Sequence, residues 1–280
     1  MSVLPTHVEP APAPPTPRRA GVEIAGHLVG EATFAVIAGP CSVVELDQTL
    51  RVARAVKAAG APMLRGGAYK PRTYPQSFQG LRERGLEILL EAKRETGLPV
   101  VTEVLDVAAI DRALMVADVI QVGARNMQNT ALLKALGRVD CAILLKRGLA
   151  ATIDETIGAA AYIRDGGNHR VVLCERGIRT FETAYRFTLD LMAVPILQQR
   201  SGLPVIVDPS HAAGDRALVL ALSKAAAAVG ADGLIVEIDE NPDLAPSDGA
   251  QQLHSADFAT FMEEVSRVAR AEGRRVLRAA

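Results

Sequence analysis

The chain has 280 residues, of which 49% are hydrophobic and 22% are charged, and this composition excludes a disordered or fibrous protein. Its 31 Lys and Arg residues nearly balance 32 Asp and Glu residues, so the formal charge of -1 gives no general attraction to nucleic acid or to an anionic membrane. No run approaches the roughly 18 apolar residues of a membrane span, and the N-terminus lacks the apolar stretch of a signal peptide. We expect a cytoplasmic protein with neither a nucleic-acid nor a membrane partner.

The N-terminal segment differs in composition from the rest of the chain. Residues 1–20 contain six of the 16 prolines and show no hydrophobic period, which predicts a disordered, Pro-rich arm. The next segment, 21–30, is expected to form a short strand or hairpin at the floor of a barrel. We expect residues 21–280 to form a single catalytic domain.

Eight short apolar runs follow, separated by longer stretches rich in Ala and Leu. The predicted strands are 34–39, 62–67, 99–104, 118–123, 141–146, 170–175, 204–209 and 233–238. The predicted helices are 45–59, 79–96, 107–115, 129–136, 152–165, 181–200, 214–228 and about 255–271, with Pro195 expected to interrupt the helix at 181–200. Eight strand–helix pairs predict a single (β/α)8 barrel. A doubly wound open sheet is the alternative, but AGPCS at 38–42 is not the Gly-rich dinucleotide turn typical of that fold.

Four side chains with metal-ligand chemistry follow the first, seventh and eighth predicted strands. These are Cys41, His211, Glu237 and Asp248. The strands become neighbours when a barrel closes, and the catalytic face of such a barrel lies at the carboxyl ends of its strands. One thiol, one imidazole and two carboxylates suit one divalent metal such as Mn²⁺, Fe²⁺, Co²⁺ or Zn²⁺. Taken singly, each residue has a structural alternative, such as a small core cysteine or a hydrogen-bonded histidine.

Seven cationic residues also lie at the ends of predicted strands or in the loops after them, although the charges of the whole chain nearly cancel. They are Arg65, Lys70, Arg72, Arg125, Lys146, Arg147 and Arg176. Arg binds phosphate and carboxylate oxygens in a bidentate manner and Lys adds a point charge, so the set predicts two anionic groups or one multiply charged substrate. For some of these cations the alternative is an ion pair with Glu103, Glu175 or Asp208.

The remaining cysteines and histidines receive no chemical role. Cys141 begins one predicted strand and Cys174 lies inside another, so both are expected to be buried wall residues. An odd number of cysteines without paired spacing indicates a reducing compartment. The other histidines do not follow predicted strands; they are His7, His27, His169 and His254.

Across residues 33–253 the sequence closely resembles the 3-deoxy-7-phosphoheptulonate (DAHP) synthases, in their short subtype without an appended regulatory domain. The motifs that carry the resemblance are AGPCS (38–42), RGGAYKPRT (65–73), SFQGL (77–81), VVTEV (100–104), QVGARNMQN (121–129), LLKRG (144–148), CERGIRTFET (174–183), VDPSHAAG (207–214) and SDG (247–249).

This resemblance implies the first step of the shikimate pathway, in which phosphoenolpyruvate condenses with erythrose 4-phosphate and water to give a seven-carbon sugar-acid phosphate and inorganic phosphate. By position, the four metal-ligand residues named above match the family's ligands. The phosphoenolpyruvate site is implied at Arg65, Lys70, Ala124, Arg125, Lys146 and Arg176. The erythrose 4-phosphate site is implied at Lys70, Pro71, Arg72, Thr73 and Asp208. The implied catalytic residues are Lys70, Glu103, Lys146 and His211.

Two departures from the family pattern concern the acceptor. Tyr74 stands where the family usually has Ser, and Asp239 stands where a His often follows the metal-ligand Glu. The alternatives are a 3-deoxy-8-phosphooctulonate synthase, which uses arabinose 5-phosphate, or a homologue that uses another aldose phosphate. The KPRT motif at 70–73 favours the heptulonate reaction. An alternative of another class is a barrel that binds anions without catalysis, which the complete set of metal-ligand residues disfavours.

The length outside the barrel suggests how the protein is regulated. A sensory domain needs about 70–90 residues, and about thirty precede the first predicted strand. We therefore expect no appended domain and no strong feedback inhibition by phenylalanine or tyrosine. Such barrels are commonly homodimers or homotetramers, and we expect one of these states.

Overall fold

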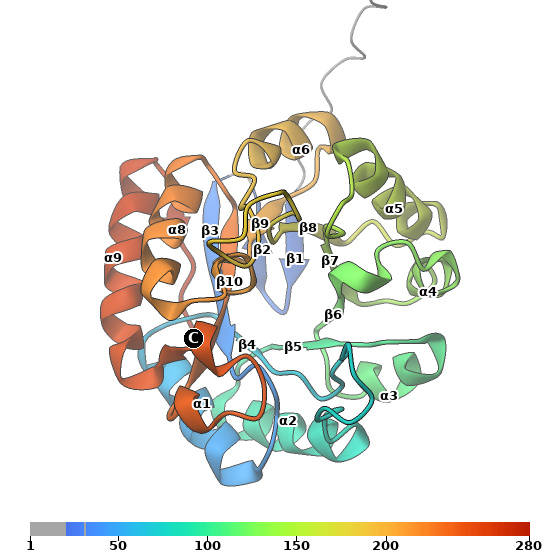
Figure 1. Cartoon of the computed structure of the whole chain (residues 1–280). Helices are drawn as coiled ribbons and strands as arrows, with labels where there is room; N and C mark the ends of the chain where they lie inside the picture. Colours follow the sequence, from blue (N-terminus) through green and yellow to red (C-terminus); the bar gives the residue numbers. More distant parts are fainter. Residues whose placement is uncertain (1–20, 31) are drawn as a thin grey trace, which may run out of the picture.

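The computed structural model describes residues 21–30 and 32–280, so the expected arm at 1–20 lies outside the described residues. Eight parallel strands form a closed ring, because the last of them, β10, pairs with the first, β3, as well as with its neighbour β9. Helices connect successive strands and surround the ring (Figure 1). The fold is a (β/α)8 barrel, as predicted, and the open-sheet alternative is wrong.

The element bounds lie close to the predicted ones in most of the chain. The barrel strands are β3 (Thr33–Gly39), β4 (Met63–Arg65), β5 (Val100–Glu103), β6 (Val119–Val122), β7 (Ala142–Lys146), β8 (Val171–Glu175), β9 (Val205–Val207) and β10 (Gly233–Asp239). The helices are α1 (Leu46–Ala58), α2 (Glu83–Thr96), α3 (Ile110–Leu114), α4 (Thr130–Leu136), α5 (Ile153–Asp165), α6 (Ala193–Ser201), α7 (Pro209–Ala213), α8 (Arg216–Ala228) and α9 (Phe258–Ala271). Two short strands, β11 (Leu253–His254) and β12 (Arg275–Val276), pair with β10 and β3.

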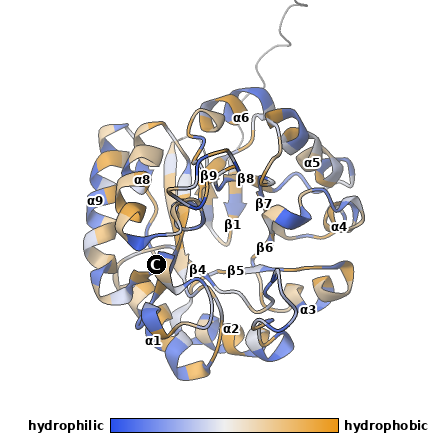
Figure 2. Cartoon of the chain, viewed as in Figure 1, coloured by the Kyte–Doolittle hydropathy of each residue, from blue (hydrophilic) through white to orange (hydrophobic). Residues whose placement is uncertain are grey.

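Two apolar layers hold the barrel together. Side chains alternate along each strand, so one set fills the interior of the ring and the other packs against the helices. Ile37 and Leu144 belong to the interior layer, whereas Leu64 and Phe258 belong to the outer layer. Each helix carries both hydrophobic and hydrophilic residues (Figure 2). Burial of both strand faces explains why the strands read as continuous apolar runs in the sequence.

A β-hairpin closes the amino-terminal end of the barrel. Its strands, β1 (Val22–Ile24) and β2 (His27–Val29), are antiparallel and are joined by two residues with positive φ, Ala25 and Gly26, as in the tight turns of hairpins. Val22, Ile24 and Val29 pack with the interior layer of the barrel. The expected hairpin is therefore present and fills the floor of the ring.

The helix predicted at 181–200 is wrong in its first half. α6 begins only at Ala193, and the preceding residues form a long loop in which Ile178 and Thr188 make an isolated β-bridge. Pro195 does not interrupt a helix, because it lies in the first turn of α6, where its missing N–H would have no partner in the helix. The short helix α7 is a further departure, since the sequence predicted a helix only from residue 214.

None of the described helices is long and apolar enough to cross a bilayer.

Candidate active site

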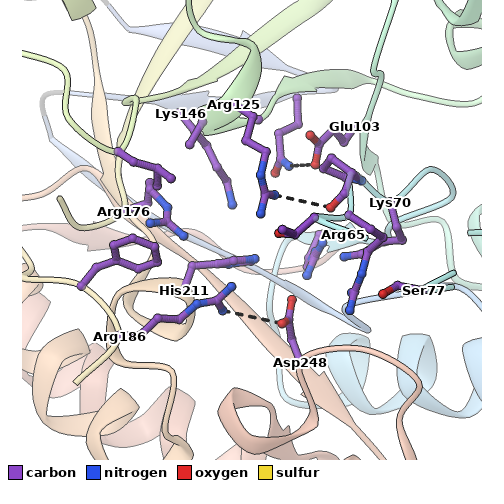
Figure 3. A pocket seen from close by; sticks show the side chains of 18 of the residues that line it. Arg65, Lys70, Ser77, Glu103, Arg125, Lys146, Arg176, Arg186, His211 and Asp248 are labelled. Atoms are coloured by element: carbon purple, nitrogen blue, oxygen red, sulfur yellow. Dashed lines mark hydrogen bonds and ion pairs between the residues drawn. The ribbon is translucent and has the colours of Figure 1, made fainter. Parts of the chain in front are cut away.

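A pocket of about 280 Å³ opens at the carboxyl ends of the barrel strands. Cationic side chains dominate its wall and point toward a shared space (Figure 3). Residues that line the pocket are Arg65, Lys70, Pro71, Arg72, Thr73, Tyr74, Ser77, Glu103, Gln121, Gly123, Ala124, Arg125, Lys146, Leu149, Arg176, Arg186, Phe187, His211 and Asp248. Most of the residues that the sequence singled out are therefore brought together.

Three of the four candidate metal-ligand residues form one buried group beside the pocket. Ligand atoms of Cys41, Glu237 and Asp248 all lie within 4.8 Å of one another. His211 lies just outside this group, with Nε2 3.5 Å from Oε1 of Glu237. Asp248 has a left-handed backbone conformation, with φ of 51°, a conformation that Asp tolerates better than most side chains do. The loop after β10 thereby turns the Asp248 carboxylate toward the Cys41 sulfur, 3.4 Å away.

A neutral, polar network fixes the position of Cys41. The side chain of Gln252 accepts a hydrogen bond from the Cys41 amide at 3.0 Å and donates one to the carbonyl of Ser247 at 3.1 Å. The Ser247 hydroxyl lies 3.2 Å from the Cys41 sulfur and can donate to it. Since Ser247 directly precedes Asp248, the same network holds the thiol and the carboxylate next to each other.

The donor set fits a borderline divalent metal. It combines one sulfur, two carboxylates and a nearby imidazole, the mixture that Mn²⁺, Fe²⁺, Co²⁺ and Zn²⁺ accept. Protein cations contact the same atoms here: Lys70 Nζ donates to the Cys41 sulfur at 2.9 Å, and Arg65 donates to Glu237 at 2.5 Å. Burial raises the pKa of the Cys41 thiol to about 12, so a bound cation would be needed to hold it as a thiolate at neutral pH.

His211 is held by Asp208, which lies beneath the pocket. Its Nδ1 lies 2.8 Å from Oδ2 of Asp208, close enough for a hydrogen bond, although the N–H direction falls outside ideal geometry. Burial lowers the pKa of His211, with Asp208 and Glu237 opposing the effect. A neutral imidazole that turns Nδ1 toward a carboxylate presents the lone pair of Nε2 to a ligand.

Asp208 also pairs with Lys146 and organises α7. Its second oxygen accepts a hydrogen bond from the His211 amide at 3.0 Å, which caps the first turn of α7. Lys146 donates to Oδ2 in a fully buried ion pair. Although burial opposes ionisation, His211 and Lys146 hold the pKa of Asp208 well below its usual range. Asp208 does not line the pocket, so the structure does not support the expected direct contact with a sugar phosphate.

One of the seven predicted ligand-binding cations, Arg147, has structural partners instead. Arg147 is buried and donates to Glu175 and Asp190, each at 2.8 Å. Glu175 in turn accepts a hydrogen bond from the Gly177 amide at 2.6 Å. The expectation that Arg147 faces an anionic ligand is therefore wrong, and the ion-pair alternative holds for this residue. The three side chains anchor both ends of the loop between β8 and α6.

The predicted acceptor segment follows β4 and forms one side of the pocket. Pro71, Arg72 and Thr73 line it, together with Tyr74, which is 69% exposed. Asp239 does not reach the pocket, because it is buried and accepts a hydrogen bond from Gln48 at 2.5 Å. Of the two departures from the family pattern, only Tyr74 therefore lines the pocket.

Six residues of the pocket wall received no role in the sequence analysis, namely Ser77, Gln121, Gly123, Leu149, Arg186 and Phe187. Arg186 and Phe187 lie in the loop that was predicted as a helix, so they were not assigned to a strand end. Arg186 reaches the metal-ligand group, with its guanidinium 3.6 Å from Oδ1 of Asp248 (Figure 3).

The expected wall cysteines are where the sequence placed them. Cys174 is buried in the interior layer of the barrel, and Cys141 is buried in the outer layer. Burial raises the pKa of Cys141 to about 11 and also raises that of Cys174, as expected for unreactive thiols.

The barrel and the cation-lined pocket at its carboxyl end define the class of protein: a (β/α)8-barrel protein built to bind small anionic molecules. A family model described as the DAHP synthetase I family matches residues 20–271. The chain belongs to this family.

Individual relatives agree with this assignment. The chain is 49% identical over 248 residues to the phospho-2-dehydro-3-deoxyheptonate aldolase of Thermotoga maritima, covering 89% of this chain and 73% of that protein. It is 33% identical over 265 residues to a 2-dehydro-3-deoxyphosphooctonate aldolase of Syntrophobacter fumaroxidans, covering 88% of this chain and 91% of the relative.

Solved structures show the same fold. The crystal structure of the Thermotoga maritima phospho-2-dehydro-3-deoxyheptonate aldolase (DAHP synthase) superposes with a TM-score of 0.89 at 46% identity, covering 92% of this chain and 75% of that one. A truncated form of the Thermotoga maritima synthase superposes with a TM-score of 0.86 at 44% identity, covering 92% of this chain and 95% of that one.

Proposed function

We propose that this protein condenses phosphoenolpyruvate with erythrose 4-phosphate and water, releasing inorganic phosphate and forming 3-deoxy-D-arabino-heptulosonate 7-phosphate, the entry to the shikimate pathway. The observation that carries the proposal is a cation-lined pocket in a chain that is 49% identical to a heptonate aldolase. In this reaction a carbon–carbon bond forms between C3 of phosphoenolpyruvate and the aldehyde carbon. Water adds at C2, and the bond from C2 to the phosphate oxygen breaks.

The cations of the pocket would bind and orient the two substrates. Both substrates are anions and repel each other in water, so their encounter requires compensating positive charge. Phosphoenolpyruvate carries a phosphate and a carboxylate, which Arg forks and Lys side chains bind well. We assign it to Arg65, Lys70, Ala124, Arg125, Lys146 and Arg176. Of these, Arg65 and Lys70 also contact the metal-ligand group, which would place the reacting end of phosphoenolpyruvate beside it.

The acceptor phosphate would lie on the other side of the pocket. We assign it to Pro71, Arg72 and Thr73, which form the wall that follows β4. A guanidinium and a hydroxyl from adjacent residues can both donate to one phosphate group. The acceptor aldehyde would then point back toward the metal-ligand residues.

We assign one divalent metal to Cys41, His211, Glu237 and Asp248. When bound, it supplies Lewis acidity toward the aldehyde oxygen. Lys70 would then release the Cys41 sulfur and turn toward the phosphoenolpyruvate anion, since its Nζ lies 2.9 Å from that sulfur and also lines the pocket.

Glu103 would act on the water that adds at C2, and Lys146 on the phosphate that leaves. Glu103 projects from the end of β5 and is held by a hydrogen bond from Gln121 at 3.0 Å. The one partner of its carboxylate within the described residues is the neutral Gln121 amide, so the carboxylate is available to accept a proton from water. Lys146 would stabilise the leaving phosphate from the opposite side.

Release of inorganic phosphate tests the reaction. We expect release with phosphoenolpyruvate and erythrose 4-phosphate together, and none with either substrate alone. Arabinose 5-phosphate is the acceptor to compare with erythrose 4-phosphate, because a relative that is 33% identical is a 2-dehydro-3-deoxyphosphooctonate aldolase. A preference for arabinose 5-phosphate would replace the proposed acceptor, and no release with any aldose phosphate would favour a barrel that only binds anions.

Metal removal tests the ligand assignment. Dialysis against a chelator should abolish activity, and Mn²⁺, Fe²⁺, Co²⁺ or Zn²⁺ should restore it to different degrees. Cys41→Ser should bind less metal when measured directly by elemental analysis, whereas Cys141→Ser, a buried thiol in the outer layer, should bind as much as the parent. Activity that survives complete metal removal would contradict the assignment.

The cytoplasmic location and a homodimeric or homotetrameric state remain predictions from the sequence. Light scattering of the purified protein would measure the oligomeric state.

A further inference from the structure

Arg176 is buried, and among the described residues no carboxylate lies within ion-pair distance of it. Its side chain is only 4% exposed, and its one hydrogen bond within the described part of the chain goes to the carbonyl of Gly177 at 3.4 Å. Arg65 and Lys146 differ, because Arg65 pairs with Glu237 and Lys146 pairs with Asp208. Lys70, also buried, donates instead to the sulfur and the carbonyl of Cys41. A buried guanidinium without a counter-charge is costly unless something else stabilises it.

An aromatic ring supplies the missing support. The guanidinium carbon of Arg176 lies 4.2 Å from the centroid of the Phe187 ring, within the range of a cation–π contact. A second guanidinium, that of Arg186, lies 5.6 Å from the same centroid. Its Nη1 donates to Gln251 at 2.5 Å, and the group lies 3.6 Å from Asp248. Phe187 therefore connects a cation assigned to substrate with one beside the metal-ligand group.

The backbone holds the Phe187 ring in place. The Phe187 amide donates to the carbonyl of Ala212 at 3.0 Å, and Ala212 directly follows His211 in α7. The next residue, Thr188, exchanges two backbone hydrogen bonds with Ile178, at 2.9 and 3.0 Å. Phe187 is thus fixed from two sides although it lies in a long loop.

Gly177 allows the close approach of this loop. A Cβ atom at Gly177 would lie 2.8 Å from Cβ of Phe187 and 3.2 Å from Cβ of Ala212. Its φ of +89° is also unfavourable for other residues. The chain between Arg176 and Phe187 can therefore fold back tightly enough to place the ring against the guanidinium.

We propose that Phe187 is a positioning residue for phosphoenolpyruvate binding: its ring holds the Arg176 guanidinium ready to bind an anionic group of the substrate. This inference rests on the proposed function. The negative face of the ring stabilises the guanidinium without occupying its N–H groups. A carboxylate at the same place would pair with those N–H groups and compete with the substrate. An aromatic partner therefore leaves the donors free for an anion.

Graded fluorination of the Phe187 ring tests the proposal in the full-length protein. Fluorine withdraws electron density from the ring face while changing its size little, so a packing role is insensitive to it. We would replace Phe187 with phenylalanines that carry one, two or three fluorines and measure the dissociation constant of phosphoenolpyruvate by calorimetry. The constant should rise with each fluorine, and Phe187→Leu should raise it about 5- to 30-fold, the range expected for a desolvated cation–π contact.

Two controls isolate the contact. Phe181 lies in the same loop, is 96% exposed and does not line the pocket, so fluorination there should leave the dissociation constant unchanged. In an Arg176→Gln background, fluorination of Phe187 should also have no effect, because the cation is absent. If the effect persists there and disappears in Arg186→Gln, the ring acts through Arg186 and the proposal is wrong.

The outcomes separate this inference from the proposed function. If the parent protein binds phosphoenolpyruvate and its dissociation constant does not change with the number of fluorines, the positioning role is refuted, whereas the proposed reaction is not. If the parent does not bind phosphoenolpyruvate at all, the proposed function fails, and the inference fails with it. Because the fluorinated variants keep the ring shape, the test does not depend on whether Phe187→Leu folds.

Discussion

Gly123→Ala should inactivate the protein without unfolding it. Gly123 follows β6 and has φ of −68° and ψ of 158°, a conformation that alanine adopts freely. The three atoms nearest to the added Cβ all belong to the carboxyl group of Glu103, and the nearest, Oε1, would lie only 2.1 Å away. The backbone therefore accepts the substitution, whereas the Glu103 carboxylate must move.

The size of the displacement predicts the size of the effect. An ordinary van der Waals contact begins near 3.4 Å, so the Glu103 oxygen must shift by roughly 1 Å or more, a misplacement that can cost about 10²-fold in rate. The shift would also disturb the hydrogen bond from Gln121. The free energy of unfolding should stay within about 1 kcal/mol of the parent, because removing a glycine from the unfolded chain offsets some of the local strain.

The assay compares kcat, from phosphate release, with stability, from urea unfolding. Gly158→Ala in α5 is the matched control, since no atom lies within 4 Å of the added Cβ; it should keep full activity and gain up to about 1 kcal/mol in stability. In a Glu103→Ala background, Gly123→Ala should cause little further loss. A kcat of Gly123→Ala within twofold of the parent, or a loss that adds fully to that of Glu103→Ala, would show that the added methyl group does not displace the Glu103 carboxylate.

Three further predictions concern stability. Thr152→Ala should lower the free energy of unfolding by about 1 kcal/mol, because the hydroxyl caps α5 within a capping box. Thr152→Ser keeps a hydroxyl and should unfold with the free energy of the parent. Equal losses in both variants would contradict the capping role. Asp208→Asn should cost about 3–5 kcal/mol in urea unfolding, because it leaves Lys146 charged and buried; a loss below about 1 kcal/mol would show that the pair is dispensable. Stability should fall as pH rises above 9, because burial raises the pKa of Cys141 to about 11 and also raises that of Cys174, so the unfolded chain loses thiol protons first. The double variant with both cysteines replaced by alanine should show a shallower fall, and an unchanged slope would refute this explanation.

Much of the barrel was predictable because its signals are local. Buried parallel strands require apolar side chains on both faces, so each appears in the sequence as a short continuous run, such as residues 141–146 and 170–175. Because the strands are parallel, residues directly after such runs all lie at the carboxyl end of the barrel, however their side chains pack. For this reason Cys41, Glu237 and Asp248 could be grouped before their contacts were known, and the structure brings them together.

Residue type and strand position did not determine side-chain direction. Lys146 and Arg147 are adjacent in sequence, but Lys146 lines the pocket whereas Arg147 turns to Glu175 and Asp190. Successive side chains at a strand end point in opposite directions. The packing of the surrounding loops decides which of the two meets a carboxylate and which faces the pocket. Likewise, Asp208 is a pocket residue by position but lies beneath the pocket as the partner of Lys146.

The sequence by itself determined the number of strands, the closure of the barrel and the kinds of side chain at its carboxyl end, since these depend on hydrophobic period and chain order. The tertiary structure alone decided which cations remain free for a ligand. Phe187 and Arg186 show this most clearly, because they reach the pocket through the bridge between Ile178 and Thr188 and through the carbonyl of Ala212. Such contacts join segments that are distant in the chain, so no local pattern encodes them, and they exist only once the barrel has closed.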